Sequence, residues 1–240
     1  MSLQVNGSEI ISLNPNAYVL DILYFMRRNN IRRIVISDSN KVIGVFTVDN
    51  AIRQILENKL EVKVSEIKLK KPVFVKNNNI KEIVNTMLSL NSDFVIYSNK
   101  YIITEKDVIR NFNWNLVKEK VSEISREAII VEPFTKISTC IEIMLRNSIR
   151  HLPVVNGIPL GIVSARDIAY SYDIISLNSR VENIMNVNLV SVEEDSYVKD
   201  SVKLMIERNI GSIIVKTGIK RKVKIFTNRD LIRLIHNYVL

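Results

Sequence analysis

Four short segments of the sequence place an acidic or amide side chain three residues after a hydroxyl side chain. The pairs are Thr47 with Asn50, Thr104 with Asp107, Ser164 with Asp167, and Thr227 with Asp230. Each pair precedes a helical pattern, so the hydroxyl can cap the helix and the later residue can complete a capping box. The same arrangement suits a nucleotide, because a helix N-terminus attracts phosphate and a carboxylate accepts hydrogen bonds from ribose. The two roles are compatible.

The residues before each pair favour the ligand role. Each hydroxyl follows two apolar residues, and the position before these holds Gly44, Tyr101, Gly161 or Lys224. Helix capping alone does not require the same apolar pair and the same spacing four times. We therefore expect four related sites within a repeated fold.

Amphipathic segments with helical spacing fix the register of the repeat. Their apolar faces are Val19-Ile22-Leu23-Met26, Ile80-Ile83-Val84-Met87, Ile137-Cys140-Ile141-Met144 and Val198-Ser201-Val202-Met205. The spacing i, i+3, i+4, i+7 is that of one helix face, and a methionine in such a face is usually core packing. We predict that each helix ends near the asparagine that follows, at Asn30, Asn91, Asn147 or Asn209.

Strand patterns complete a β-α-β-β-α unit around each of these helices. First strands are predicted at 9–13, 73–76, 129–131 and 189–192. Hairpins are predicted at 34–46, 94–103, 154–163 and 212–226, with turns at 38–40, 98–100, Asn156-Gly157 and Thr217-Gly218. Second helices should begin near Asp49, Lys106, Arg166 and Arg229. The predicted class is α+β, with repeats at 1–60, 61–120, 121–180 and 181–240. A unit of about 60 residues is only marginally stable alone, so we expect the pairs 1–120 and 121–240.

The repeat resembles the CBS domain, named after cystathionine β-synthase, whose hallmark is Gly-apolar-apolar-Ser/Thr-x-x-Asp before its final helix. The resemblance implies two Bateman modules that sense AMP, ADP, ATP or S-adenosylmethionine without turning them over. Carried over by position, it implies ligand contacts at Ser164, Asp167, Arg166, Arg150, His151, Pro153, Thr227, Asp230, Arg229, Thr104, Asp107, Thr47 and Asn50. The third repeat matches best, whereas Asn50 replaces the motif carboxylate, Lys224 replaces a glycine, and Tyr101 is expected to crowd its cleft.

The remaining chemistry-bearing residues indicate no catalytic or metal centre. Glycine-rich phosphate loops and nucleophile elbows are absent from the sequence, and neither His151 nor His236 has a cluster of metal ligands beside it. Cys140, the single cysteine, is expected to be a buried thiol, and Trp114 a packing residue. We therefore expect a sensor and not an enzyme.

The net charge of +9 favours anionic partners. The basic stretches 68–76 and 216–224 keep a nucleic-acid-binding module open as an alternative, which is not favoured because RNP and helix-turn-helix signals are lacking. A ligand-free assembly scaffold is a further alternative. Without an apolar run of membrane-spanning length or a signal-peptide pattern, we expect a cytoplasmic protein. The CBS resemblance implies that it regulates a separate chain and that its modules meet as a flat disc, which the chain closes by itself or as a homodimer.

Overall fold

The computed structural model describes residues 3–39, 41–217 and 222–239, and these residues divide into two compact units. Unit 1 contains residues 1–10, 73–128 and 190–240, and unit 2 contains residues 11–72 and 129–189. Each unit thus combines two repeats that are not consecutive, the second with the fourth and the first with the third. The consecutive pairing at 1–120 and 121–240 joins repeats of different units and stays a prediction.

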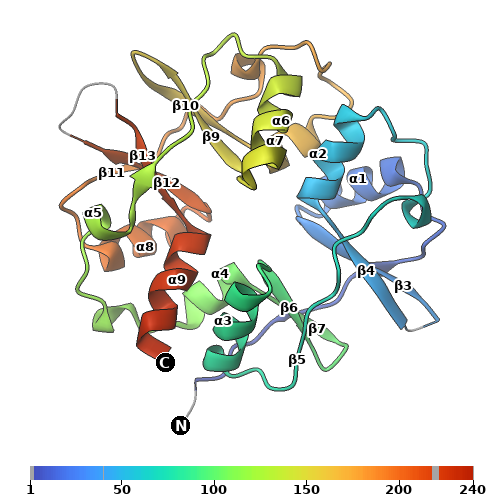
Figure 1. Cartoon of the computed structure of the whole chain (residues 1–240), viewed down its shortest axis with the longest axis horizontal. Coiled ribbons are helices and arrows are strands. Elements are labelled where there is room, and N and C mark those ends of the chain that lie inside the picture. Colours follow the sequence, from blue (N-terminus) through green and yellow to red (C-terminus); the bar gives the residue numbers. More distant parts are fainter. Residues whose placement is uncertain (1–2, 40, 218–221, 240) are drawn as a thin grey trace. The chain divides into compact units, whose positions relative to one another are not determined.

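Unit 2 contains two copies of the predicted unit, in blue and yellow in Figure 1. The first repeat consists of β2 (Ser12–Leu13), α1 (Val19–Arg28), β3 (Arg33–Asp38), β4 (Lys41–Thr47), α2 (Val48–Leu56) and a 3-10 turn, η1 (Val64–Glu66). The third repeat consists of α6 (Ile137–Asn147), β9 (His151–Asn156), β10 (Ile158–Ser164), α7 (Ala165–Tyr170) and η3 (Val181–Asn183). In the first repeat β2 runs parallel to β3, and β3 pairs with β4 in a hairpin.

The first strand predicted for the third repeat, at 129–131, is reduced to a single parallel bridge between Val131 and Val154. The chain turns away directly afterwards, because Pro133 follows and the Glu132 N–H donates to the Thr135 hydroxyl at 3.1 Å. The strand prediction was wrong here because it did not weigh this turn.

Unit 1 contains the second and fourth repeats, in green and red in Figure 1. The second repeat consists of β5 (Phe74–Val75), α3 (Ile80–Ser89), β6 (Phe94–Tyr97), β7 (Tyr101–Thr104), α4 (Glu105–Asn111), η2 (Trp114–Leu116) and α5 (Val121–Ile124). The fourth consists of β11 (Ser191–Glu193), α8 (Val198–Glu207), β12 (Ser212–Lys216), β13 (Lys224–Thr227) and α9 (Asn228–Val239). Two added strands, β1 (Ser8–Glu9) and β8 (Arg126–Glu127), extend these sheets to the orders β1-β7-β6-β5 and β11-β12-β13-β8.

The strand predicted at 9–13 is two strands. β1 pairs with β7 of the second repeat and β2 with β3 of the first, so the chain passes from unit 1 to unit 2 between Ile10 and Ile11.

The predicted helix ends are confirmed at Asn30, Asn91 and Asn209, which have positive φ, but in the third repeat the residue with positive φ is Ser148, at φ 53°. Asn147 is the last residue of α6 instead. Gly218 of the fourth predicted turn lies outside the described residues.

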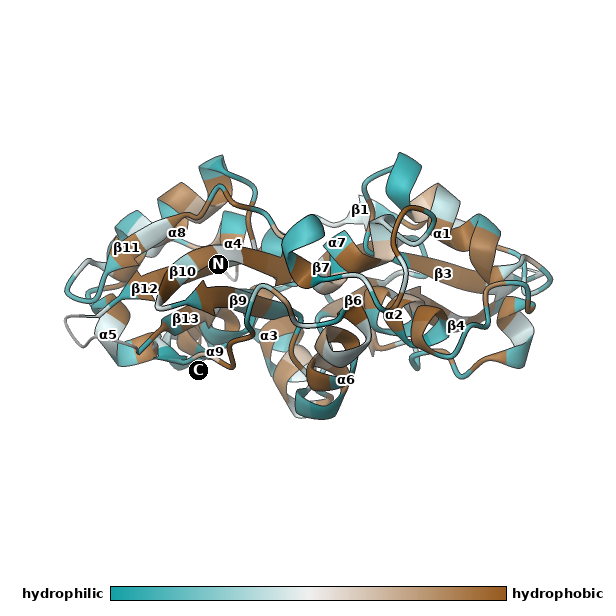
Figure 2. Ribbon diagram, turned by 90° about the horizontal axis from the view of Figure 1, so that it is seen from above, coloured by the Kyte–Doolittle hydropathy of each residue, from teal (hydrophilic) through white to brown (hydrophobic). Residues whose placement is uncertain are grey.

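The methionine faces form the cores, as predicted. All four faces are buried, and Met26, Met87, Met144 and Met205 are at most 2% exposed. One apolar cluster fills unit 1 and another fills unit 2. In Figure 2 the strands β3, β6 and β9 are brown along most of their length, whereas α1 and α6 carry both brown and teal residues. The helices therefore turn one face to their own sheets and leave the other to solvent.

Candidate functional site

The pairs predicted at the four strand-to-helix junctions are in contact, and complete capping boxes occur at the junctions of the first three repeats. In each repeat the backbone N–H of the hydroxyl residue donates to the side-chain oxygen three residues later, at 2.8 to 3.0 Å. Each hydroxyl group also donates to that same oxygen, at 2.7 to 3.0 Å. A ligand at one of these junctions must therefore use the remaining atoms of the acidic or amide side chain.

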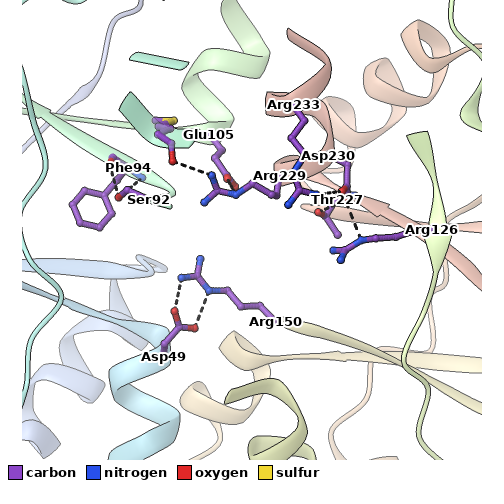
Figure 3. Close-up of polar contacts among 11 residues, drawn as sticks. Asp49, Ser92, Phe94, Glu105, Arg126, Arg150, Thr227, Arg229, Asp230 and Arg233 are labelled. Atoms are coloured by element: carbon purple, nitrogen blue, oxygen red, sulfur yellow. Dashed lines mark hydrogen bonds and ion pairs between the residues drawn. The ribbon is translucent and has the colours of Figure 1, made fainter. Parts of the chain in front are cut away.

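The junctions differ in whether the polar atoms of the acidic or amide side chain that lie outside the capping box are already bonded within the protein. We call a junction open where such an atom is unbonded and closed where it is bonded. In the described part of the chain, Oδ1 of Asp167 and of Asp107 accepts no hydrogen bond, so it is left for an external donor. Asp230 differs, because its Oδ1 lies 3.1 Å from Nη1 of Arg233 and 3.6 Å from Nε of Arg126 (Figure 3). The Asp230 side chain is also 6% exposed. The junction of the fourth repeat is closed by the chain itself.

The junction of the first repeat is closed in another way. Asn50 is buried, and its Nδ2 donates to the backbone carbonyl of Lys68 at 2.8 Å. A carboxylate could not make this bond, which explains why an amide replaces the motif acid. Lys68 belongs to the segment that follows η1, which we call the linker. The linker continues alongside β4, where Val45 and Lys70 exchange backbone hydrogen bonds of 2.9 and 3.1 Å. A Cβ atom on Gly44 would lie 2.6 Å from Cβ of Leu69, so the motif glycine makes room for the linker.

In every repeat, a segment from outside the β-α-β-β-α unit pairs with the third strand. These crossing segments are Ser8–Glu9 on β7, Lys70 beside β4, Arg126–Glu127 on β13 and Asn186 beside β10. In the second repeat the close approach is made possible by Gly7, where a Cβ atom would lie 2.5 Å from the Ile102 carbonyl oxygen. Tyr101 can therefore stand at the motif glycine position without blocking the crossing segment.

Unit 2 contains a cluster of four arginines at its junctions, Arg32, Arg33, Arg150 and Arg166, which we call the arginine cluster. Burial, followed by the charges of Arg166 and Arg33 and to a smaller extent that of Arg150, lowers the pKa of Arg32 to about 10. Within the described residues, the side chains of Arg32 and Arg166 form no hydrogen bond and no ion pair. Like charges in a partly buried site are held there at an electrostatic cost, which a bound anion would remove.

The Asp49 carboxylate contacts this cluster directly. Asp49 receives two hydrogen bonds from Arg150, from Nε at 2.8 Å and from Nη2 at 2.5 Å (Figure 3). The side chains are 40% and 28% exposed, so the pair is accessible to solvent. Asp49 belongs to the first repeat and Arg150 to the third.

The corresponding place in unit 1 is electrically compensated. Nε of Arg229 lies 3.0 Å from Oε1 of Glu105, and its Nη1 donates to the Met87 carbonyl at 3.3 Å (Figure 3). The side chains of Arg229 and Glu105 are 20% and 13% exposed. Arg229, predicted as a phosphate contact, is thus held by the protein's own carboxylate.

The remaining predicted site residues of the third repeat lie beside the arginine cluster. His151 and Pro153 belong to β9, and His151 pairs in register with Ser164, whose hydroxyl caps α7. Sequence reasoning overlooked Arg32, Asp49 and Glu105. A signal for Arg32 exists, because Ile31-Arg32-Arg33-Ile34 has the same pattern as Ile149-Arg150-His151-Leu152. For Asp49 and Glu105 the sequence offers no signal, since their partners lie more than 100 residues away.

Other candidate residues have structural roles. Burial raises the pKa of the Cys140 thiol to about 12, consistent with the predicted inert cysteine. The Trp114 indole N–H donates to the Ile109 carbonyl at 2.8 Å, and its ring packs edge-on against Phe112. Among the described residues, no group of three metal-ligating side chains occurs and no helix is long and apolar enough to cross a bilayer.

The repeated fold and the hydroxyl-x-x-acid junctions define a protein of tandem CBS units. The CBS domain sequence pattern matches residues 4–57, 121–173 and 181–237, and the chain belongs to the CBS domain family. The protein MJ1225 of Methanocaldococcus jannaschii is 27% identical over 95% of both chains.

Two solved structures share the fold along nearly the whole chain. The crystal structure of MJ1225, described as a candidate archaeal homologue of g-AMPK, has a TM-score of 0.84 with 22% identity and covers 96% of this chain and 98% of its own. A conserved protein from Pyrococcus horikoshii has a TM-score of 0.65 with 19% identity, covering 98% and 100%. At these identities the likeness establishes the fold.

Proposed function

We propose that the chain is a regulatory protein that binds a phosphate-bearing adenosyl ligand, such as AMP, ADP or ATP, in unit 2. The observation that carries this proposal is the arginine cluster. The positive charges of Arg32 and Arg166 repel each other, and neither side chain has a carboxylate partner among the described residues. Phosphate supplies the missing negative charge, and guanidinium groups bind it with charge-assisted hydrogen bonds.

The nucleoside end is assigned to the third repeat. Asp167 leaves Oδ1 available for the ribose hydroxyls, while its Oδ2 holds the Ser164 cap in place. Because Ser164 and Asp167 begin the helix that carries Arg166, a ligand bound there has ribose and phosphate contacts within one turn of helix. The CBS resemblance assigns the adenine side to the β9 segment with Pro153.

The comparison of junctions supports one preferred site. Asp230 is surrounded by Arg126 and Arg233, and Asn50 is bonded to the linker, so the fourth and first junctions are already satisfied by the chain. Asp107 keeps an available oxygen, but the arginine near it, Arg229, is paired with Glu105. The third junction alone of these four combines an available carboxylate oxygen with the arginine cluster in the described part of the chain.

Isothermal titration calorimetry with ATP, ADP, AMP, S-adenosylmethionine and adenosine tests the proposal. We expect saturable binding of the phosphorylated ligands and at least about tenfold weaker binding of adenosine, because one charge-assisted hydrogen bond contributes about 1.5–3 kcal/mol. Arg166→Gln should weaken ATP binding by about tenfold or more. Arg146→Gln is the matched control, since Arg146 is exposed on α6 and outside the cluster. Equal binding of adenosine and ATP, or an Arg166→Gln variant with parental affinity, would contradict the phosphate assignment.

A further inference from the structure

We propose that Asp49 is an internal anion that competes with the ligand's phosphate for Arg150. This inference rests on the proposed function and specifies how its affinity is set. The Asp49 carboxylate holds the Arg150 guanidinium in a two-point contact, at 2.8 and 2.5 Å. An incoming phosphate group presents the same kind of oxygen acceptors to the same donors.

The pair is built so that it can open without unfolding its surroundings. The Arg150 backbone is fixed, because its carbonyl accepts a hydrogen bond from the Ala165 N–H at 2.9 Å, at the start of α7. The side chain beyond that anchor is long, and the Asp49 and Arg150 side chains are 40% and 28% exposed. Solvent can therefore hydrate Asp49 when Arg150 leaves, which keeps the exchange inexpensive.

The corresponding positions of unit 1 show that the fold does not require this pair. The carbonyl of Gly211 accepts a hydrogen bond from the Asn228 N–H at 3.0 Å, so Gly211 occupies the place of Arg150. Lys106, the third residue of its junction, occupies the place of Asp49 and donates to the Asn209 carbonyl at 2.9 Å. Neither charge is retained there. The Asp49–Arg150 pair therefore belongs to the arginine cluster of unit 2 and not to the architecture of the repeat.

Competition of this kind converts ligand occupancy into a change between two repeats. Asp49 lies on α2 of the first repeat, and Arg150 precedes β9 of the third. When phosphate takes Arg150, the ion pair between these repeats is lost and Asp49 faces a second negative charge. The ligand then acts through its different affinities for the closed and open states of the pair.

The test measures ADP affinity of the full chain by calorimetry for the parent, Asp49→Asn and Asp173→Asn. Asp49→Asn should lower the dissociation constant about fivefold, equivalent to about 1 kcal/mol, the upper value for a solvent-accessible ion pair. Asp173→Asn is the control, because Asp173 pairs with Arg27 at 2.6 Å, also between the first and third repeats but away from the cluster. Its affinity should stay within about twofold of the parent.

Each outcome decides one of the two proposals. If the parent binds ADP but Asp49→Asn binds it equally or more weakly, the competition is refuted and the proposed function stands. If the parent binds none of the phosphorylated ligands, the proposed function itself fails. Should Asp49→Asn not fold, as judged by circular dichroism, Asp49→Ser gives the same reading, because Ser also removes the charge and suits a first helical turn.

Discussion

Replacing Arg32 by Met should stabilise the ligand-free protein while removing part of the proposed ligand site. Arg32 is partly buried, and burial together with the charges of Arg166, Arg33 and Arg150 lowers its pKa well below the ordinary value, to about 10. One pKa unit corresponds to about 1.4 kcal/mol, so keeping the charge in the fold costs about 3 kcal/mol. Met has an unbranched side chain that can fill the same space without a charge.

We expect the free energy of unfolding to rise by about 2 kcal/mol, because the guanidinium retains part of its hydration and the full cost is not recovered. For a chain of this size that corresponds to a Tm increase of about 4–8 °C. The folded pKa lies below the unfolded one, so the destabilisation by Arg32 is complete below about pH 10 and fades as the pH rises towards the unfolded pKa. A measurement at pH 7 therefore captures the whole effect.

The assay is thermal and urea unfolding followed by circular dichroism, with Arg146→Met as the control. Arg146 is exposed on α6, and its replacement should change stability by less than about 0.5 kcal/mol. The same Arg32→Met protein should bind ADP more weakly than the parent. If Arg32→Met lowers the stability by 1 kcal/mol or more, the charge is compensated in the fold and the electrostatic reasoning behind the ligand site is wrong.

Two further predictions concern the closed junction and the cysteine. Asn50→Asp restores the family's motif carboxylate and should destabilise the protein by about 1–3 kcal/mol in urea unfolding, because the Lys68 carbonyl loses its donor and faces a negative charge. Unchanged stability would show that the hydrogen bond from Nδ2 contributes nothing. Cys140 should resist alkylation by iodoacetamide at pH 8 in the native protein and react once urea unfolds it, since burial raises the pKa of its thiol to about 12. Rapid labelling of the native protein would mean that the core opens readily.

Local patterns were sufficient to predict the helices and hairpins. The Met26 and Met87 faces and the Asn156-Gly157 turn depend on neighbours within a few residues, and the structure has them as expected, with Gly157 at φ 71°. The run at 9–13 could not be assigned correctly in the same way. Its pattern reads as one strand, but its two halves pair with strands that begin at Arg33 and Tyr101.

The sequence was sufficient to predict the strand-to-helix junctions of the candidate site, but not which of its charged side chains form ion pairs. Ser164 and Asp167 form the expected junction because a capping box is a local motif. Oδ1 of Asp230 lies near Arg233, three residues later, and near Arg126, which is about 100 residues distant in the sequence, and only the first of these pairs is local. Ion pairs between long side chains depend on tertiary packing, which spacing along the chain does not encode. Charge balance is therefore the property that required the structure.

The crossing segments have a consequence for how such a chain can arise and be divided. The strand edge of the second repeat is covered by Ser8–Glu9, and that of the fourth by Arg126–Glu127, both of which precede their repeats in sequence by many residues. A gene fragment encoding residues 61–120 would thus yield a domain with a bare edge on β7, and bare edges promote aggregation. Duplication or recombination of single repeats would be selected against unless the flanking segments travelled with them, so inheritance of this architecture favours larger blocks than one repeat.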